Sequence, residues 1–175
     1  REDEFVDLVR FMVELGKEGK FKTSNQRFAR QWEVLPVNSP NPGTIHHYGA
    51  KMFTQEFNGY QWKPFYAMVG GELPFDEVPV ALNRRGDKYQ VMRTQVEVAK
   101  KGEHKVRISG NLKHLYLFLG DQLIDIPSEG DQTDLVIDFK KSGKQNLLMV
   151  VNGSSGKGYF SMEALSDDLQ VINTL

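Results

Sequence analysis

The sequence predicts a mainly β domain, an antiparallel β-sandwich of the jelly-roll kind, with one amphipathic helix at its amino-terminal end. Strand-like segments of alternating apolar and polar residues recur about every ten residues in the carboxy-terminal half, which is typical of sandwiches. Turn residues such as Gly, Asn, Asp and Pro stand between these segments. Helical spacing of apolar residues is confined to the first residues of the chain.

The predicted helix covers residues 2–15, where apolar residues recur at intervals of three and four. Acidic residues crowd its first turn, where the helix dipole favours negative charge, and Gly16 follows as a helix-ending residue. We assign residues 1–20 to this helix and interpret it as the remnant of an upstream domain. Residues 21–31 are polar and basic and are expected to form a linker, and residues 32–175 form the sandwich.

The first strands are expected at residues 32–35, 51–57 and 61–69. The last two flank Asn58-Gly59, a pair of residues that strongly favours a hairpin turn. Pro64 has no backbone N–H to donate, so the strand that contains it is expected at a sheet edge.

From Tyr89 the alternation becomes regular. One face is expected to carry Met92, Thr94, Val96 and Val98, and the other to carry Arg93, Gln95 and Glu97. The unbroken apolar run at residues 115–119 predicts a central strand that is covered on both faces and forms the floor of the core. A tight turn at Gly120-Asp121 then leads to a partner strand at residues 123–126.

Three further strands complete the predicted sandwich. Residues 135–139 alternate and indicate a half-buried strand, whereas residues 147–151 are continuously apolar. Residues 159–165 are expected to form the last strand.

The composition excludes several classes of function. The 175 residues carry a net charge of -1, which gives no basic excess for a nucleic acid or an anionic membrane surface. No apolar run approaches the roughly 18 residues of a membrane span. The chain has no cysteine, so it has neither disulfides nor thiolate metal sites. We therefore expect no nucleic-acid partner and no membrane insertion.

Exposed aromatic rings near polar side chains are the main candidates for a binding site. Flat rings can stack on the faces of sugars, while Asn, Gln and Asp side chains hydrogen-bond their hydroxyl groups. The candidate residues are Tyr48, Tyr60, Trp62 and Tyr66. The alternative is that the larger rings, Trp32, Trp62 and Phe65, belong to the hydrophobic core.

Carboxylates cluster between residues 121 and 138, and hard oxygen ligands of this kind suit calcium. We name Asp121 and Asp125 as candidate calcium ligands, with solvated turn residues as the alternative. Two of these acids would also suffice for a glycosidase pair, because only their separation in space matters for that chemistry.

Two stretches resemble a known family. Residues 3–21, DEFVDLVRFMVELGKEGKF, resemble the final helix of the c-type cytochrome domain in large multidomain bacterial haem-binding proteins, often labelled sorbosone or membrane-bound dehydrogenases. Residues 60–79 and the segment LYLFLGDQLIDIP resemble the β-rich region that follows it, and the latter is also similar to a unit of protective-antigen-like and galactose-binding-like sandwiches. The family's Cys-x-x-Cys-His motif is absent from this chain, so no haem role carries over.

The resemblance implies a non-catalytic accessory domain of a larger exported bacterial protein, periplasmic or extracellular. Its expected partner is carbohydrate or the upstream domain of the same protein, and it is expected to hold no cofactor, with calcium as the one candidate ion. Two alternatives stay open: a structural or dimerisation module, and a glycoside hydrolase that uses a carboxylate pair. The residues leave the oligomeric state open.

Overall fold

The computed structural model describes residues 27–35, 62–82, 88–112, 115–127, 130–152 and 158–172. The helix expected at residues 2–15 and the strand expected at residues 51–57 lie outside this described part, as do Tyr48 and Tyr60. Within it the chain forms β-strands that pair antiparallel in two sheets. The prediction of a mainly β, antiparallel sandwich is confirmed at this level, while the jelly-roll connectivity stays a prediction.

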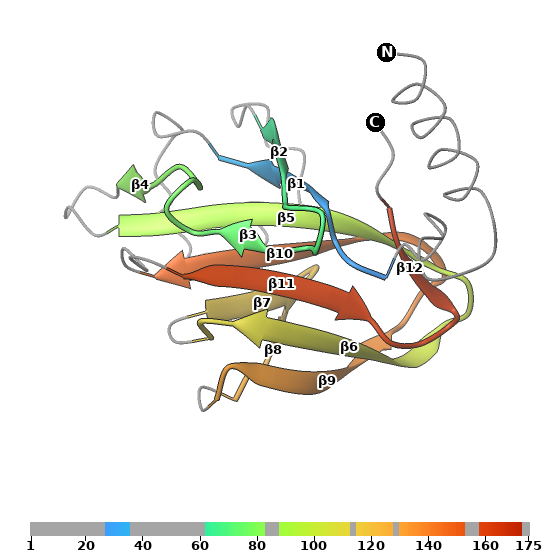
Figure 1. The fold of residues 1–175 in the computed structure, drawn as a ribbon. Coiled ribbons are helices and arrows are strands. Elements are labelled where there is room, and N and C mark those ends of the chain that lie inside the picture. Colours follow the sequence, from blue (N-terminus) through green and yellow to red (C-terminus); the bar gives the residue numbers. More distant parts are fainter. Residues whose placement is uncertain are drawn as a thin grey trace, which may run out of the picture.

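The two sheets lie against each other as layers (Figure 1). The main path of the larger sheet is, in order, β2 (Lys63–Tyr66), β1 (Gln31–Val34), β5 (Lys88–Val98), β10 (Gly143–Asn152), β7 (Leu115–Leu119) and β8 (Gln122–Ile124). Two more strands, β4 (Ala81–Leu82) and β12 (Leu169–Val171), also pair with β5. The smaller sheet has the order β3 (Leu73–Pro74), β11 (Tyr159–Ala164), β6 (Gly102–Gly110) and β9 (Gln132–Phe139).

The core lies between the layers because each sheet turns alternate residues inward. On β5 the inward residues are those predicted: Met92, Thr94, Val96 and Val98 are all buried. Trp32 of the larger sheet meets Phe160 of the smaller sheet edge to face, with ring centroids 5.7 Å apart. The Trp32 indole N–H donates to the carbonyl of Ala29 at 3.0 Å, so its polar atom is satisfied inside the core.

The strand at residues 115–119 is not central. It forms β7, which lies beside the edge strand β8, and the centre of the larger sheet is β5 and β10. An apolar run shows that both faces of a strand are covered, but it carries no information on how many strands lie to either side. The predicted hairpin is confirmed: Leu119 pairs with Gln122, and Gly120 adopts a positive φ of 57° in the turn.

Two further differences concern the ends of the described part. The strand expected last, at residues 159–165, is β11, and β12 follows it after a turn at Ser166. Residues 27–29, expected in a linker, instead line up with β11: Ala29 N–H donates to Met162 O at 2.9 Å, and Ala164 N–H to Arg27 O at 2.7 Å. The pairing joins segments that lie far apart in the sequence. Three residues are too few to show an alternating pattern, so the sequence did not predict it.

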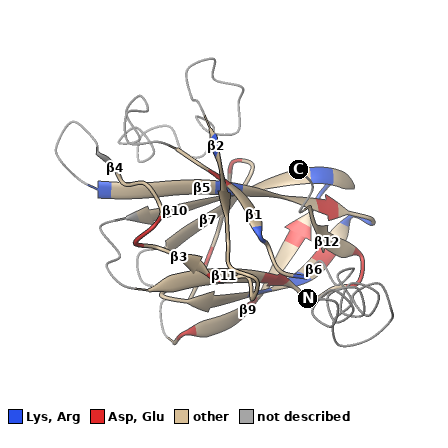
Figure 2. Ribbon diagram, turned by 45° about the horizontal axis from the view of Figure 1, so that its top comes forward, with Lys and Arg blue, Asp and Glu red and all other residues tan. Residues whose placement is uncertain are grey.

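The two edges of β5 are used differently. One edge pairs with β10 along the whole length from Tyr89 to Val98. The other edge is shared by three short strands in succession: β4 near Tyr89, β1 at Met92 and Arg93, and β12 from Val96 to Val98. Figures 1 and 2 both show β4, β1 and β12 following one another along β5. A notch therefore remains between β1 and β12.

The predicted edge position of Pro64 is confirmed, since β2 ends the main path of the larger sheet. The strand is shorter than the expected residues 61–69, because β2 covers only Lys63–Tyr66. In the described part of the chain, no helix is long and apolar enough to cross a membrane.

Candidate functional site

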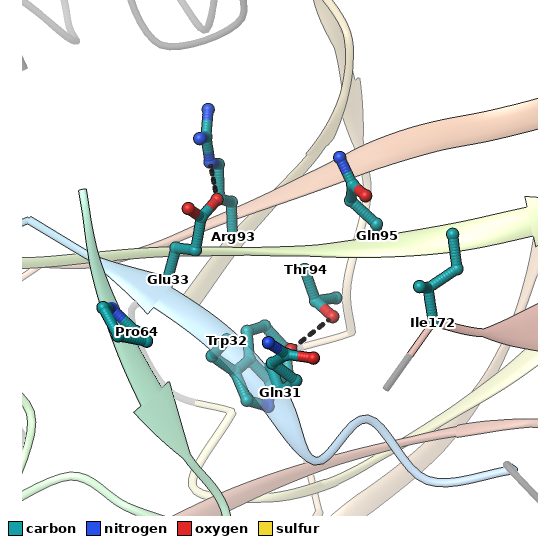
Figure 3. A pocket seen from close by; sticks show the side chains of 8 residues that line it. All are labelled: Gln31, Trp32, Glu33, Pro64, Arg93, Thr94, Gln95 and Ile172. Atoms are coloured by element: carbon teal, nitrogen blue, oxygen red, sulfur yellow. Dashed lines mark hydrogen bonds and ion pairs between the residues drawn. The ribbon is translucent and has the colours of Figure 1, made fainter. Parts of the chain in front are cut away.

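A pocket of about 330 Å³ opens at the notch between β1 and β12 (Figure 3). Its walls come from β1, β2, β5 and the residue that follows β12. The lining residues are Gln31, Trp32, Glu33, Pro64, Arg93, Thr94, Gln95 and Ile172. Most of them carry polar side chains, and no cysteine or histidine is among them.

Two hydrogen bonds hold the sides of the notch. The Thr94 hydroxyl donates to the carbonyl of Gln31 at 2.9 Å, which fixes the end of β1 against β5. The backbone N–H of Ile172 donates to the carbonyl of Gln95 at 2.9 Å, which fixes the end of β12 one residue further along β5. The opening is therefore set by backbone positions of the sheet, which makes it a preformed feature.

An ion pair stands at one side of the pocket. Glu33 and Arg93 lie opposite each other in the pairing of β1 with β5, and Arg93 Nε donates to Glu33 Oε2 at 2.6 Å. The guanidinium carbon of Arg93 also lies 4.2 Å from the ring centroid of Trp62, a cation–π contact. Arg93 is thus held by a carboxylate and by an aromatic face.

Arg93 and Glu33 each have polar atoms that their ion pair does not use. Within the described part of the chain, the Nη groups of Arg93 and Oε1 of Glu33 make no further hydrogen bond. The two side chains are 26% and 43% exposed, respectively, so a ligand in the pocket can reach them. In Figure 3 their polar ends rise on the same side of the strands as the amide of Gln95.

Asn146 lies next to this group. It is opposite Gln95 in the pairing of β10 with β5, and its Oδ1 atom is buried without a hydrogen-bond donor among the residues that the structure describes. An unsatisfied buried acceptor costs about 1–3 kcal/mol. Asn146 therefore places a buried acceptor beside Gln95, outside the residues that line the pocket.

Two of the four predicted aromatic residues lie beside the pocket. Trp62 is half-buried and packs against apolar residues of the larger sheet, and one of its faces is covered by Arg93. Tyr66 is 54% exposed and lies opposite Gln31 in the pairing of β1 with β2. The structure thus gives the two rings different surroundings: Trp62 holds Arg93, whereas the ring of Tyr66 is open to solvent.

The candidate calcium ligands lie elsewhere. Asp121 is exposed in the turn between β7 and β8, and Asp125 is exposed just after β8. Asp125 lines a second groove of about 340 Å³ between β8 and β9. Among the described residues, no three His, Cys, Asp or Glu side chains stand close enough to hold a metal. A calcium site at Asp121 and Asp125 stays a prediction.

The second groove also contains Asp134, whose surroundings favour its charged form. Arg107 donates to both of its oxygens, at 2.7 and 3.0 Å, and this hydrogen bonding is the main cause that lowers the pKa of the Asp134 carboxyl. A glycosidase acid needs a raised pKa. Asp134 is therefore suited to an ion pair and not to proton donation.

Comparisons with known proteins give structural likeness only. No family model matches the chain, and no curated protein matches it. Among solved structures, a β-glucosidase from Kluyveromyces marxianus in complex with glucose matches with a TM-score of 0.44 and 11% identity, over 79% of this chain and 17% of that chain. This chain spans less than a fifth of two β-glucosidase chains from that organism, at 17% and 19%.

Smaller proteins match over most of their length. The epithelial adhesin 6 A domain from Candida glabrata in complex with Galb1-3GlcNAc matches with a TM-score of 0.38 and 8% identity, over 86% of this chain and 89% of that chain. The PA14 sugar-binding domain from an RTX adhesin matches with a TM-score of 0.36 and 9% identity, over 83% and 73%. At these scores the likeness assigns neither a family nor a function.

Proposed function

We propose that this chain is a non-catalytic accessory domain that binds carbohydrate in the pocket between β1, β5 and β12. The observation that carries the proposal is the fixed pair of Glu33 and Arg93 beside the amide of Gln95, in a preformed pocket with the open ring of Tyr66 near its rim. Binding pockets for small ligands join apolar walls to convergent polar groups, and this pocket sets its polar groups beside Trp32, Pro64 and Ile172.

The polar groups match the hydroxyl groups of a sugar. Each sugar hydroxyl both donates and accepts a hydrogen bond, so it needs an acceptor and a donor close together. Oε1 of Glu33 accepts, the Nη groups of Arg93 donate, and the amide of Gln95 does both. These three side chains would then bind two neighbouring hydroxyl groups of one sugar. The aromatic ring of Tyr66 would contact the apolar face of that sugar.

The wider setting of the domain is part of the same proposal. The resemblance found in the sequence supports an accessory domain with jelly-roll connectivity in a larger exported bacterial haem-binding protein, periplasmic or extracellular. In that setting the upstream domain of the same protein is a second partner. The chain itself would act without a cofactor.

Calorimetric titration with neutral monosaccharides and disaccharides tests the proposal. We expect the parent chain to bind at least one of them and to leave it unhydrolysed. Gln95→Ala removes a polar group from the pocket and is expected to weaken binding about tenfold, since a hydrogen bond to an uncharged group is worth about 1 kcal/mol and the partner left unpaired costs more.

Gln132→Ala is the matched control, because Gln132 is also an exposed glutamine on a strand but belongs to β9 of the smaller sheet. This variant should bind as the parent does. Equal binding by both variants would place the sugar elsewhere, and absence of binding by the parent to every sugar would contradict the proposed function.

A further inference from the structure

We propose that the pocket selects neutral sugars over sugars that carry a carboxylate, and that Glu33 is the residue that determines this preference. The inference rests on the proposed function, since it names the class of carbohydrate that the same pocket binds.

The charges that line the pocket cancel. Among the described residues that line it, only Glu33 and Arg93 are charged, and Arg93 Nε and Glu33 Oε2 are 2.6 Å apart. An anionic ligand is recognised when a cation in the site lacks a counter-charge, which is how arginines bind carboxylates. Here Arg93, the one cation among the described lining residues, already has its counter-charge inside the pocket.

Arg93 is also held beside Glu33 by a second contact. It is opposite Glu33 in the strand pairing, and the ring of Trp62 lies 4.2 Å from its guanidinium carbon on one face. Arginine binds a carboxylate bidentately with two parallel N–H groups. Because Nε is occupied by Glu33, the edge of the guanidinium that combines Nε with Nη is not available to a second carboxylate.

A carboxylate on the ligand would therefore meet Glu33. To reach the remaining Nη groups it would approach the free Oε1 of Glu33, and two like charges about 4 Å apart near a protein surface weaken binding by about tenfold or more. A hydroxymethyl group at the same position has no such cost. Its oxygen accepts from Arg93, and its hydrogen is donated to Glu33.

Matched pairs of ligands test this preference directly. Methyl glucoside and methyl galactoside differ from the corresponding methyl uronosides only in that a CH₂OH group replaces a carboxylate. The methyl esters of the uronosides keep the carbonyl and lose the charge. We expect the parent chain to bind the neutral glycosides and the esters about tenfold more tightly than the uronosides. This gap should shrink at high salt, because partly exposed charges are screened.

Glu33→Gln tests the assigned residue. Glutamine keeps the shape of the side chain and can still accept from Arg93 through its amide oxygen, but it leaves the positive charge uncompensated. We expect the uronosides to bind this variant at least as tightly as the neutral glycosides. Glu97→Gln is the control: Glu97 faces the same side of β5 but does not line the pocket, so the preference of the parent should be retained.

The outcomes separate the inference from the proposed function. Tighter binding of the uronosides by the parent, or an unchanged preference in a folded Glu33→Gln variant, would overturn the inference and leave sugar binding in place. If no glycoside of any kind binds the parent, the proposed function fails and the inference fails with it. Should Glu33→Gln not fold, the ester comparison and the salt dependence in the parent chain decide the matter.

Discussion

The outer faces of the two sheets differ in what they present. The larger sheet carries a second apolar cluster on the face turned away from the core, formed by Leu35, Tyr89, Val91, Phe118, Leu148 and Val150, with Trp62 and Tyr116 packed against it. The smaller sheet carries an ion-pair network of Arg107 with Asp134 and Glu163 on its outer face, and Val136 is 56% exposed there. Among the described residues, the larger sheet thus has buried apolar side chains on both of its faces.

This difference bears on how the residues of the pocket are supported. The apolar cluster holds Trp62, and Trp62 in turn holds Arg93 at the rim of the notch. The smaller sheet has ion pairs as well, and their side chains are partly exposed, so solvent screens them in part. A polar group that recognises a ligand needs rigid support, and the covered face provides it.

Truncation of one apolar side chain on each outer face should give the largest contrast. Leu148→Ala removes a fully buried side chain from the outer cluster of the larger sheet, and we expect a loss of about 2–5 kcal/mol in the free energy of unfolding. Val136→Ala on the smaller sheet should change it by less than about 0.5 kcal/mol. Urea unfolding of both variants measures this, and similar losses would show that the two faces are equally covered.

Replacement of Trp62, whose ring lies against Arg93, should have an intermediate effect, and the quantity that changes is the affinity for sugar. In Trp62→Leu the contact between the ring and Arg93 is lost, which is worth about 0.5–1 kcal/mol, so sugar affinity should fall about two- to fivefold. Trp62→Phe keeps a ring and should lose less. Titration of both variants with the sugar that binds the parent measures the effect; equal losses would mean that Trp62 acts through its size alone.

The ion pair on the smaller sheet should give the smallest effect, visible only in acid. Hydrogen bonding from Arg107 lowers the pKa of Asp134 below its ordinary value of 3.8. A carboxyl whose pKa is lower in the folded chain stabilises the fold above its unfolded pKa, and this contribution is lost as the pH falls through the folded pKa.

Unfolding midpoints of the parent and of Asp134→Asn, followed from neutral pH into acid, measure this contribution. The parent should lose its small advantage over the variant as the pH falls below 3.8. Both side chains are partly exposed, at 34% and 47%, so salt should reduce the difference as well. A constant difference between the two proteins at every pH would contradict the assignment.

Several features of the fold could be predicted from the residues alone. Alternation on β5 and β9 gave the correct inward and outward positions, and Gly120-Asp121 gave the correct hairpin. The apolar run in β7 correctly indicated cover on both faces, but its place in the sheet was wrong. Alternation is a local property of the chain, whereas the order of strands depends on which distant segments pair.

The candidate site was predictable only in part. Trp62 and Tyr66 were found because large aromatic residues beside polar ones stand out in a sequence. Glu33 was not identified as a candidate, because nothing in the sequence distinguishes a single glutamate in a short strand from other surface glutamates. The alternation placed Arg93 and Gln95 on the correct face of their strand, but nothing in the sequence indicated that they line a pocket.

The sequence by itself determined which residues of β5 and β9 are buried, since that follows from a two-residue period and from the free energy of removing apolar groups from water. The tertiary structure alone decided the pocket. Three strands from distant parts of the chain share one edge of β5, and the notch between two of them brings Glu33, Arg93 and Ile172 together. That meeting depends on the register of long-range strand pairs, which is set by the packing of the whole sandwich.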